Sequence, residues 1–535
     1  MTPTPALLNP TDSTPDETLA GSSPFQNKIA SLDEKIAWHY EQISVLKAER
    51  NALPPIHRLP NELLALVLVM YAIESESLST LKWTKTMLVC RRWYDLALVP
   101  HALWGHIDLG WNRNPSRLRL QLERSGVAPL EIKVLACDNL RYTRAIFDNS
   151  SRVESVELAG EAKYIHHFVH NLDNHIFPCL RSLCLEPGVK EDDALEEPVL
   201  ALPDSVFEGG MPCLRELKLR SIHVPWGTLR DLEGLSLTGD IHFARPGIPT
   251  FTDLLAMLRA CPQLRDLTLD FLIPSLTLDV HHDAVELPFL TSMSLRAPLA
   301  DCTALLNHLS FPATATITLY PGGIHAGADA AEILIPVRKH VRAPSSPPSV
   351  LLRIACQAGR ERAGFSHFNM GVYPSTAPPK PMDPATLSLN SHPTDGDALG
   401  EIMSAIFTAF PTTAITHLDA RKGAGLTQHT WSTALRALAA LDTVYFQATD
   451  GHAALLDALA DLDPPVRSLG LCVAMWEYES YALLALLTRL KALLESWHVK
   501  VVPFSFWRST SFVIGWGTNR SGSWKRCCLS FQAGF

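Results

Sequence analysis

The sequence lacks several features that define whole classes of protein. Its 11 cysteines are scattered without a C-x-x-C pair, which fits reduced core thiols in the cytoplasm or the nucleus. The first 25 residues are rich in Pro, Ser and Thr and lack the basic-then-apolar order of a signal peptide. Apolar runs such as 63–72 stop well short of the roughly 20 residues that cross a bilayer as a helix. We therefore expect an intracellular protein without a membrane span.

The sequence also has no excess of positive charge. The 535 residues carry a net charge of -9, and no basic patch stands out. Nucleic acids and anionic membranes are held by positively charged surfaces. We therefore expect neither as a partner. With 47% hydrophobic and 19% charged residues, the chain can bury a large core, and its length indicates two or three structural units.

Motifs of catalysis are missing as well. A search for phosphate loops, nucleophile elbows and metal-ligand spacings gives no convincing match. The best candidate for a metal site is a histidine group, formed by His166, His167, His170 and His175. It lacks nearby thiolates and a carboxylate partner in a closed geometry. His281-His282-Asp283 and the acidic cluster 191–197 are typical of polar loops. We expect no catalytic residue, no metal and no cofactor, so the chain is predicted not to be an enzyme.

After a disordered segment, residues 1–25, a helix is predicted over 26–53. Its apolar residues follow a heptad a/d series, Ile29, Leu32, Ile36, Ile43, Leu46 and Leu53, interrupted by His39 and Arg50. Pro54-Pro55 ends the helix near Ala52, because proline lacks an N–H donor and restricts the preceding residue. Two interpretations stay open: a short coiled coil that makes a homodimer, or a single helix packed on its own neighbour.

Three further helices are predicted in the next 45 residues. Pro60 and Glu62 suit the first turn of a helix that begins in the run 56–68. A second amphipathic stretch spans 78–88, and a third helix follows over 89–98 with apolar residues at helical spacing. The segment 103–109 then reads as a short strand with alternating faces.

These residues carry a family resemblance. Leu59-Pro60-x-Glu62-Leu63-Leu64, then Val89-Cys90-Arg91-x-Trp93, then Leu103-Trp104 closely resemble the F-box, assigned to 56–108. The preceding heptad helix, followed by Ile56-His57-Arg58-Leu59-Pro60-x-Glu62-Leu63-Leu64, resembles in particular the F-box proteins of mushroom-forming fungi. The resemblance implies a docking surface that inserts into a Skp-type adaptor, which a cullin carries in turn. The residues it implies for adaptor binding are Leu59, Pro60, Leu63, Leu64, Val67, Val89, Cys90, Trp93 and Leu96. Trp93 and Leu96 suit an internal core equally well, and the alternative for the whole surface is that it packs internally.

A different pattern covers 109–503. The block apolar-x-x-apolar-x-apolar recurs at 153–158, 180–185, 214–219, 232–237, 264–269, 290–295, 415–420, 441–446 and 466–471. Helical segments precede several blocks, at 252–261, 396–410, 431–440 and 452–459. Each helix-strand unit has one apolar face that it cannot bury alone, so neighbours stack. The pattern resembles irregular leucine-rich repeats. The predicted fold class is mixed α+β and α/β: a helical F-box followed by a leucine-rich-repeat-like solenoid, or horseshoe, with a compact α/β domain as the alternative.

Two segments depart from this pattern. Residues 321–393 are rich in Pro, Ala and Ser, so we expect loops to interrupt the repeats there, around one strand at 350–355. Residues 504–535 contain Trp507, Trp516 and Trp524 among Gly, Ser and Arg, without helix-strand alternation. This tail is predicted to be disordered or an artefact of the gene model.

Three functional hypotheses follow. In the first, the chain is a substrate receptor of an SCF-type (Skp-cullin-F-box) ubiquitin ligase, which supplies proximity while partner subunits catalyse the transfer. In the second, the same surface serves an interaction protein in a non-degradative assembly. In the third, a hydrolase is hidden in the repeat region. The target protein has no signature in the sequence.

Overall fold

The computed structural model describes residues 24–110, 114–188, 200–239, 250–274, 283–322, 327–341, 348–357, 367–380, 383–391, 396–409, 412–423, 426–447, 452–462, 466, 468–474, 488–493, 517–518 and 525–532. The chain divides into two compact units. The first comprises Met1–His106 with Leu120–Gly126, and the second comprises Ile107–Arg119 with Val127–Phe535. Most of the predicted disordered N-terminus, residues 1–23, lies outside the described residues.

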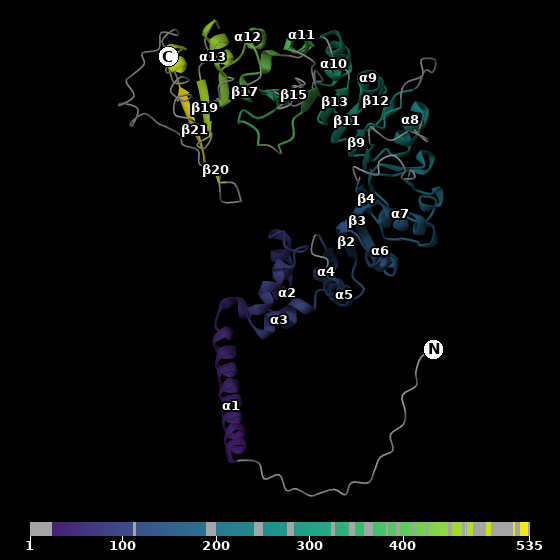
Figure 1. The fold of residues 1–535 in the computed structure, drawn as a ribbon, viewed down its shortest axis with the longest axis vertical. Coiled ribbons are helices and arrows are strands. Elements are labelled where there is room, and N and C mark those ends of the chain that lie inside the picture. The colour runs from purple at the N-terminus through teal and green to yellow at the C-terminus, as the bar shows by residue number, and fades with distance from the viewer. Residues whose placement is uncertain are drawn as a thin grey trace, which may run out of the picture. The chain divides into compact units, whose positions relative to one another are not determined.

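The first unit is helical (Figure 1). Its elements are α1 (Pro24–Ala52), η1 (Pro55–Arg58), α2 (Asn61–Glu74), η2 (Lys82–Leu88), α3 (Arg91–Leu98) and α4 (His101–Trp104), and α5 (Pro115–Arg124) crosses the division between the units. Helix α1 ends ahead of Pro54-Pro55, as the sequence predicts. The short helices share one apolar core, made of Leu64, Leu68, Ala72, Trp83, Leu96, Ala97, Leu103 and Trp104. The rings of Trp83 and Trp104 meet edge to face at 5.0 Å, the arrangement that aromatic pairs favour.

Two predictions in this unit need correction. The stretch 78–88 contains a 3₁₀-helix, η2, and the preceding Leu81 adopts a left-handed conformation with φ of 56°. The predicted strand 103–109 was wrong at its start, because Leu103 and Trp104 end helix α4 and only β1 (His106–Asp108) is extended. The side chains of Leu103 and Trp104 are both buried. Two consecutive inward side chains fit a helix end, whereas a strand would point one of them outward.

The second unit contains a large and mostly parallel sheet. Its strands are β1 (His106–Asp108), β2 (Leu130–Cys137), β3 (Val153–Glu161), β4 (Ser182–Gly188), β6 (Glu216–Arg220), β8 (Gly234–Thr238), β9 (Asp266–Asp270), β11 (Ser292–Pro298), β13 (Thr316–Gly322), β14 (Leu351–Gln357), β15 (His367–Tyr373), β16 (Leu387–Ser391), β17 (His417–Lys422), β18 (Thr443–Gln447), β19 (Ser468–Ala474), β20 (Gly517–Thr518) and β21 (Lys525–Gln532). From β2 to β13 each strand pairs in parallel with the next. Two short parallel pairs stand apart: β5 (Leu200–Ala201) with β7 (Ile222–His223), and β10 (Val285–Glu286) with β12 (Leu309–Ser310).

The recurring apolar blocks explain this sheet. Each block overlaps a strand, and in the eight blocks from 153–158 to 441–446 the last two apolar residues point to the same face. In β6, for example, Leu217 and Leu219 are buried while Lys218 between them is exposed. Leu217 lies opposite Leu183 of β4 and Leu235 of β8, so the leucines of neighbouring blocks stack in register. One face of the sheet is therefore apolar, and the other is polar.

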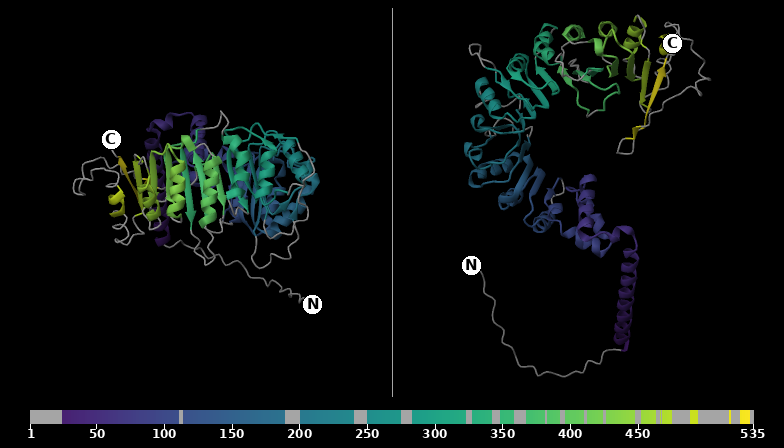
Figure 2. Two further views of the ribbon diagram at one scale, coloured as in Figure 1. Left: turned by 90° about the horizontal axis from the view of Figure 1, so that it is seen from above. Right: turned by 180° about the vertical axis from the view of Figure 1, so that it is seen from behind.

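In the described part of the chain, the helices of this unit lie along one face of the sheet (Figure 2). They are α6 (Leu140–Phe147), α7 (Ala162–Asn171), α8 (Phe251–Ala260), α9 (Leu299–Asn307), α10 (Gly327–Val341), α11 (Gly396–Ala409), α12 (Gln428–Ala437) and α13 (Ala453–Ala460). Single turns of 3₁₀-helix connect some elements: η3 (Ser150–Arg152), η4 (Leu172–Asn174), η5 (Asp204–Val206), η6 (Trp226–Thr228) and η7 (Thr412–Ala414). The four helices predicted before blocks correspond to α8, α11, α12 and α13, within a few residues at each end.

The irregular segment 321–393 contains more than loops. It holds helix α10, although Pro336 lies within it, and strands β14, β15 and β16. Strand β15 is antiparallel to both β14 and β16, while β16 pairs in parallel with β13 and β14 pairs in parallel with β17. The parallel order is thus interrupted by regular antiparallel structure, which the repeat pattern does not indicate.

The predicted atypical tail is described only in part. Strand β21 (Lys525–Gln532) pairs antiparallel with β19, and β20 pairs with β21. The segment 504–516, with Trp507 and Trp516, lies outside the described residues, as does Trp524. Among the helices that the structure describes, none is both long and apolar enough to traverse a lipid bilayer.

Candidate functional site

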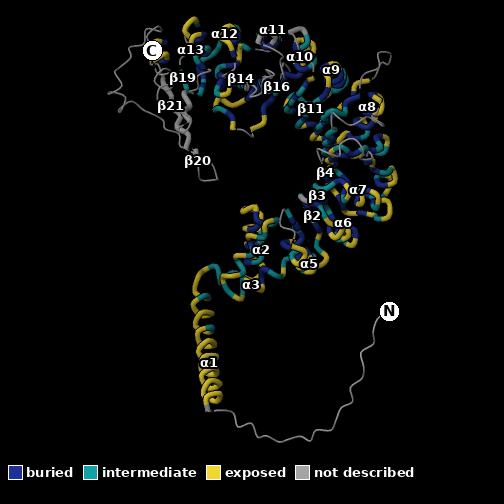
Figure 3. The backbone as a smooth tube through the Cα atoms, viewed as in Figure 1, coloured by how far each residue is buried: buried dark blue, intermediate teal, exposed yellow. Residues whose placement is uncertain are grey.

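Helix α2 exposes an apolar face that the protein does not use internally (Figure 3). Leu64, Leu68 and Ala72 form its buried side. The opposite side, called here the α2 outer face, consists of Leu63, Leu66, Val67, Met70, Tyr71 and Ile73. These side chains are 41% to 56% exposed. A helix that is apolar on all sides is normally buried on all sides, so the α2 outer face is suited to contact another polypeptide.

The predicted adaptor-binding residues fall into three groups. Pro60, Leu63, Val67 and Val89 are exposed. Leu59, Cys90 and Trp93 are half-buried, and Leu59 and Trp93 pack against the helical core. Leu64 and Leu96 belong to that core. The structure thus leaves the first group free for docking, while Leu64 and Leu96 stabilise the helices that carry it.

One arginine holds the Leu59-Pro60 segment in place. The guanidinium of Arg92 in α3 donates hydrogen bonds to the carbonyl oxygens of His57 and Leu59, each at 2.5 Å. It also donates two to Oδ1 of Asn61, from Nε at 3.0 Å and from Nη2 at 2.9 Å. The planar fork of arginine suits such multiple bonds. Arg92 therefore joins α3 to the beginning of α2.

Sequence reasoning missed both Arg92 and part of the outer face. Arg92 occupies the unspecified position of Val89-Cys90-Arg91-x-Trp93, so the motif gives no reason to single it out. Leu66, Met70 and Ile73 lie outside the quoted motif. They follow Leu63 by three, seven and ten residues, and this helical spacing was the available signal because it places them on one helix face.

Comparison with known protein families gives a match in this region. A model described as F-box-like matches residues 56–110. The chain therefore contains an F-box-like domain at these residues, which correspond to the segment from η1 to β1. The comparison with curated proteins finds no match to this chain.

The histidine group does not form a metal-binding arrangement in the described residues. His166 and His170 lie on α7 with ring centroids 6.2 Å apart. His175 stacks on Phe147, and its Nδ1 lies 2.9 Å from the carbonyl oxygen of Asn171. No cluster of three or more His, Cys, Asp or Glu side chains that could hold a metal occurs in the described parts of the chain. His281, His282 and the acidic cluster 191–197 lie outside them.

The polar face of the sheet is a second candidate surface. One register row across it runs through Lys133, Glu157, Cys184, Lys218, Ser236, Thr268, Ser294 and Thr318. Lys133 pairs with Glu157 and Lys218 with Glu186, each at 2.7 Å. The hydrogen bond from Lys218 lowers the pKa of the Glu186 carboxyl. The face presents charges and hydroxyls in a regular array.

Further along the same sheet, a carboxylate lies between two guanidinium groups. Asp419 of β17 is nearly inaccessible to solvent and accepts bonds from Nε of Arg353 at 2.9 Å and Nε of Arg421 at 2.8 Å. Both arginines also donate to the carbonyl oxygen of Pro379, at 2.5 Å and 3.2 Å. Burial raises the pKa of the Asp419 carboxyl, but the two arginines outweigh it and the pKa falls below its ordinary value of 3.8. The cluster ties β14, β17 and the segment after β15 together.

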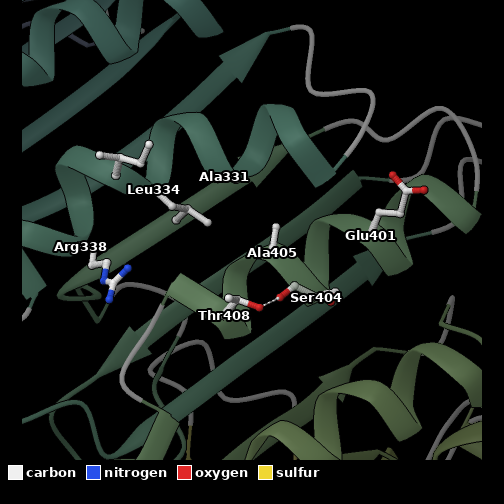
Figure 4. A pocket seen from close by; sticks show the side chains of 8 residues that line it. Ala331, Leu334, Arg338, Glu401, Ser404, Ala405 and Thr408 are labelled. Carbon is white, nitrogen blue, oxygen red and sulfur yellow. Dashed lines mark hydrogen bonds between the residues drawn. The ribbon is translucent and has the colours of Figure 1, made fainter.

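A hollow of about 520 Å³ lies between α10 and α11 (Figure 4). It is lined by Ala331, Leu334, Ile335, Arg338, Glu401, Ser404, Ala405 and Thr408. Thr408 donates its hydroxyl hydrogen to the carbonyl oxygen of Ser404 at 2.8 Å. The lining is a mixed helix-helix groove without a paired nucleophile and base among its residues, so the α2 outer face remains the leading candidate site.

Proposed function

We propose that this protein is a substrate receptor of an SCF-type ubiquitin ligase. Its F-box-like domain binds a Skp-type adaptor and, through it, a cullin. The observation that carries the proposal is the α2 outer face, an exposed apolar helix face within residues that match an F-box-like model. The receptor itself catalyses nothing and needs no cofactor, because it acts by holding a target close to the transferred ubiquitin.

In this proposal the second unit recognises the target. The stacked parallel strands from β2 to β13, with helices along one face, support a solenoid of leucine-rich-repeat type. The polar face then supplies the target-binding surface, because its side chains form rows on the sheet while the leucines of each block are buried in the core. The narrower resemblance to F-box proteins of mushroom-forming fungi stays a prediction.

We place the protein in the cytoplasm and/or the nucleus. The eight cysteines from Cys90 to Cys356 are free thiols, and several of them, such as Cys137 and Cys302, are buried. Burial raises the pKa of the Cys137 thiol to about 11 and that of Cys302 to about 12. Such thiols stay protonated and unreactive. They fit a reducing compartment, where the ubiquitin ligase would act.

Copurification from cells tests the proposal. The full chain is expected to bring down a Skp-type adaptor together with a cullin, and Leu59→Asp combined with Pro60→Ala is expected to abolish both. A charge placed in a desolvated apolar contact costs several kcal/mol, which offsets most of the binding free energy of such an interface. Adaptor without cullin would favour a non-degradative assembly. Enzymatic activity that survives deletion of residues 56–108 would favour a hydrolase.

A further inference from the structure

Helix α1, together with Leu53 just after its end, presents an apolar seam to solvent. The seam consists of Ile29, Leu32, Ile36, Ile43, Leu46 and Leu53, and these residues are 45% to 73% exposed (Figure 3). Phe25 extends the same series by one position and is exposed as well. In the described residues of the first unit, the contact of α1 that stands out is with η1, which directly follows it in the chain. The interpretation in which α1 packs on a neighbour of its own chain therefore has no support in this part of the structure.

The a and d positions of the seam hold side chains of different shape. Every apolar a position holds Ile, at 29, 36 and 43, and every apolar d position from residue 32 onward holds Leu, at 32, 46 and 53. A β-branched residue at a with Leu at d favours a parallel coiled coil of two strands, because each side chain fits the hole that this geometry offers. From these observations we propose that α1 binds α1 of a second copy of this chain in a parallel two-stranded coiled coil.

Charges beside the seam agree with a parallel partner. Lys28 occupies a g position, and Asp33 occupies the e position of the next heptad. In a parallel pair in register, Lys28 of one copy faces Asp33 of the second copy, and symmetry repeats the attraction. His39 at d and Arg50 at a interrupt the seam. In a parallel pair in register, each of them faces the same residue of the second copy. Polar residues at such positions reduce the stability of the coil and fix its register.

The length of α1 sets the strength of the dimer. A helix of 29 residues is about 43 Å long, and a strip roughly 10 Å wide on each copy gives a footprint of about 900 Å² for both. Specific interfaces begin near 1,000–1,200 Å². The dimer is therefore expected to form at micromolar concentration and to dissociate on dilution.

The test is the mass of the full chain in solution, measured by sedimentation equilibrium over a range of concentrations. The expected mass approaches twice 59.0 kDa at tens of micromolar. Ile43→Glu, at an a position, is expected to weaken the dimer at least 100-fold. Val45→Glu is the matched control, because Val45 is 49% exposed against 45% for Ile43 but lies off the seam at a c position. A monomer at every concentration, or equal loss in both variants, would overturn the proposal.

The parallel orientation of the two α1 helices is tested by a separate measurement. Leu32→Cys brings two identical thiols together only in a parallel pair in register, since position 32 then faces itself. Mild oxidation of the full chain is expected to yield a disulfide between the two copies at position 32, identified by mass spectrometry. Ser31→Cys, at a c position, is expected to give none. Linkage at 31 as readily as at 32 contradicts a parallel coil. The dimer is independent of adaptor binding, so either proposal can fail alone.

Discussion

At the scale of single residues, the F-box-like domain depends on a contact that its motif does not name. Arg92 reaches from α3 to the backbone of His57 and Leu59 and to the side chain of Asn61. The neighbouring Arg91 is exposed to solvent. The short segment that contains Pro60 therefore has a fixed path, and the α2 outer face begins at a defined position.

Arg92→Ala is expected to weaken adaptor binding about 10-fold or more, because hydrogen bonds to a charged group contribute about 1.5–3 kcal/mol each. Arg92→Lys should not restore it, since an ammonium cannot span the same acceptors. Calorimetric titration of the purified adaptor into the full chain measures the affinity. Arg91→Ala is the matched control and should bind like the unaltered protein. Equal affinities for Arg92→Ala and Arg91→Ala would refute the positioning role.

Asp419 makes stability depend on pH in a predictable direction. Its pKa in the folded protein lies below the ordinary value of 3.8, so it contributes stability at neutral pH and loses this contribution as pH falls through the acid range. Asp419→Asn is expected to lower the free energy of unfolding at pH 7 by about 3 kcal/mol, because two half-buried guanidinium groups lose their buried counterion. Urea unfolding at pH 7 and near pH 3 should show the deficit shrinking at the lower pH. A constant or growing deficit would contradict this account.

At the scale of elements, β2 and β3 approach each other at a glycine. Gly160 in β3 has φ of +152° and pairs with Cys137 in β2. A β-carbon at this position would lie 2.4 Å from the backbone nitrogen of Cys137. No side chain fits there unless the strands separate. Glycine is required here by a close approach of two backbones as well as by its conformation.

Gly160→Ala is therefore expected to destabilise the second unit by at least about 2 kcal/mol. Hydrogen exchange of the β2 and β3 amides, together with the urea midpoint, measures the effect. Gly227→Ala serves as the control, because a β-carbon at Gly227 meets nothing within 4 Å. If both variants unfold at the same urea concentration as the unaltered protein, the close approach carries no energetic weight.

At the scale of the whole molecule, the sequence predicts repeated local patterns well and solitary features poorly. The blocks predict the strands because burial of every second residue repeats along the chain, as at Leu217 and Leu219. The antiparallel β15 could not be predicted, since its partners are chosen by contacts with β14 and β16 that no local pattern encodes. Leu103 and Trp104 show the same limit, because both are buried by packing in the helical core, which includes the distant Trp83.

The candidate site was likewise predictable only in part. Leu63 and Val67 were predicted as binding residues and are exposed, whereas Leu64, also predicted, lies in the core. The sequence shows that α2 is apolar on every side but does not say which side its own domain covers. That depends on where η2 and α3 pack, which only the folded structure shows.

The central claim is that the α2 outer face binds a Skp-type adaptor, and its most direct test is the affinity of the full chain for the purified adaptor. Leu63→Asp with Val67→Asp is expected to weaken binding at least 100-fold while leaving the fold intact, because both side chains are exposed. Ile176→Asp, which changes an apolar residue of the second unit that is 65% exposed, should have no effect. Unchanged affinity in the double variant, with its circular dichroism spectrum preserved, would contradict the account.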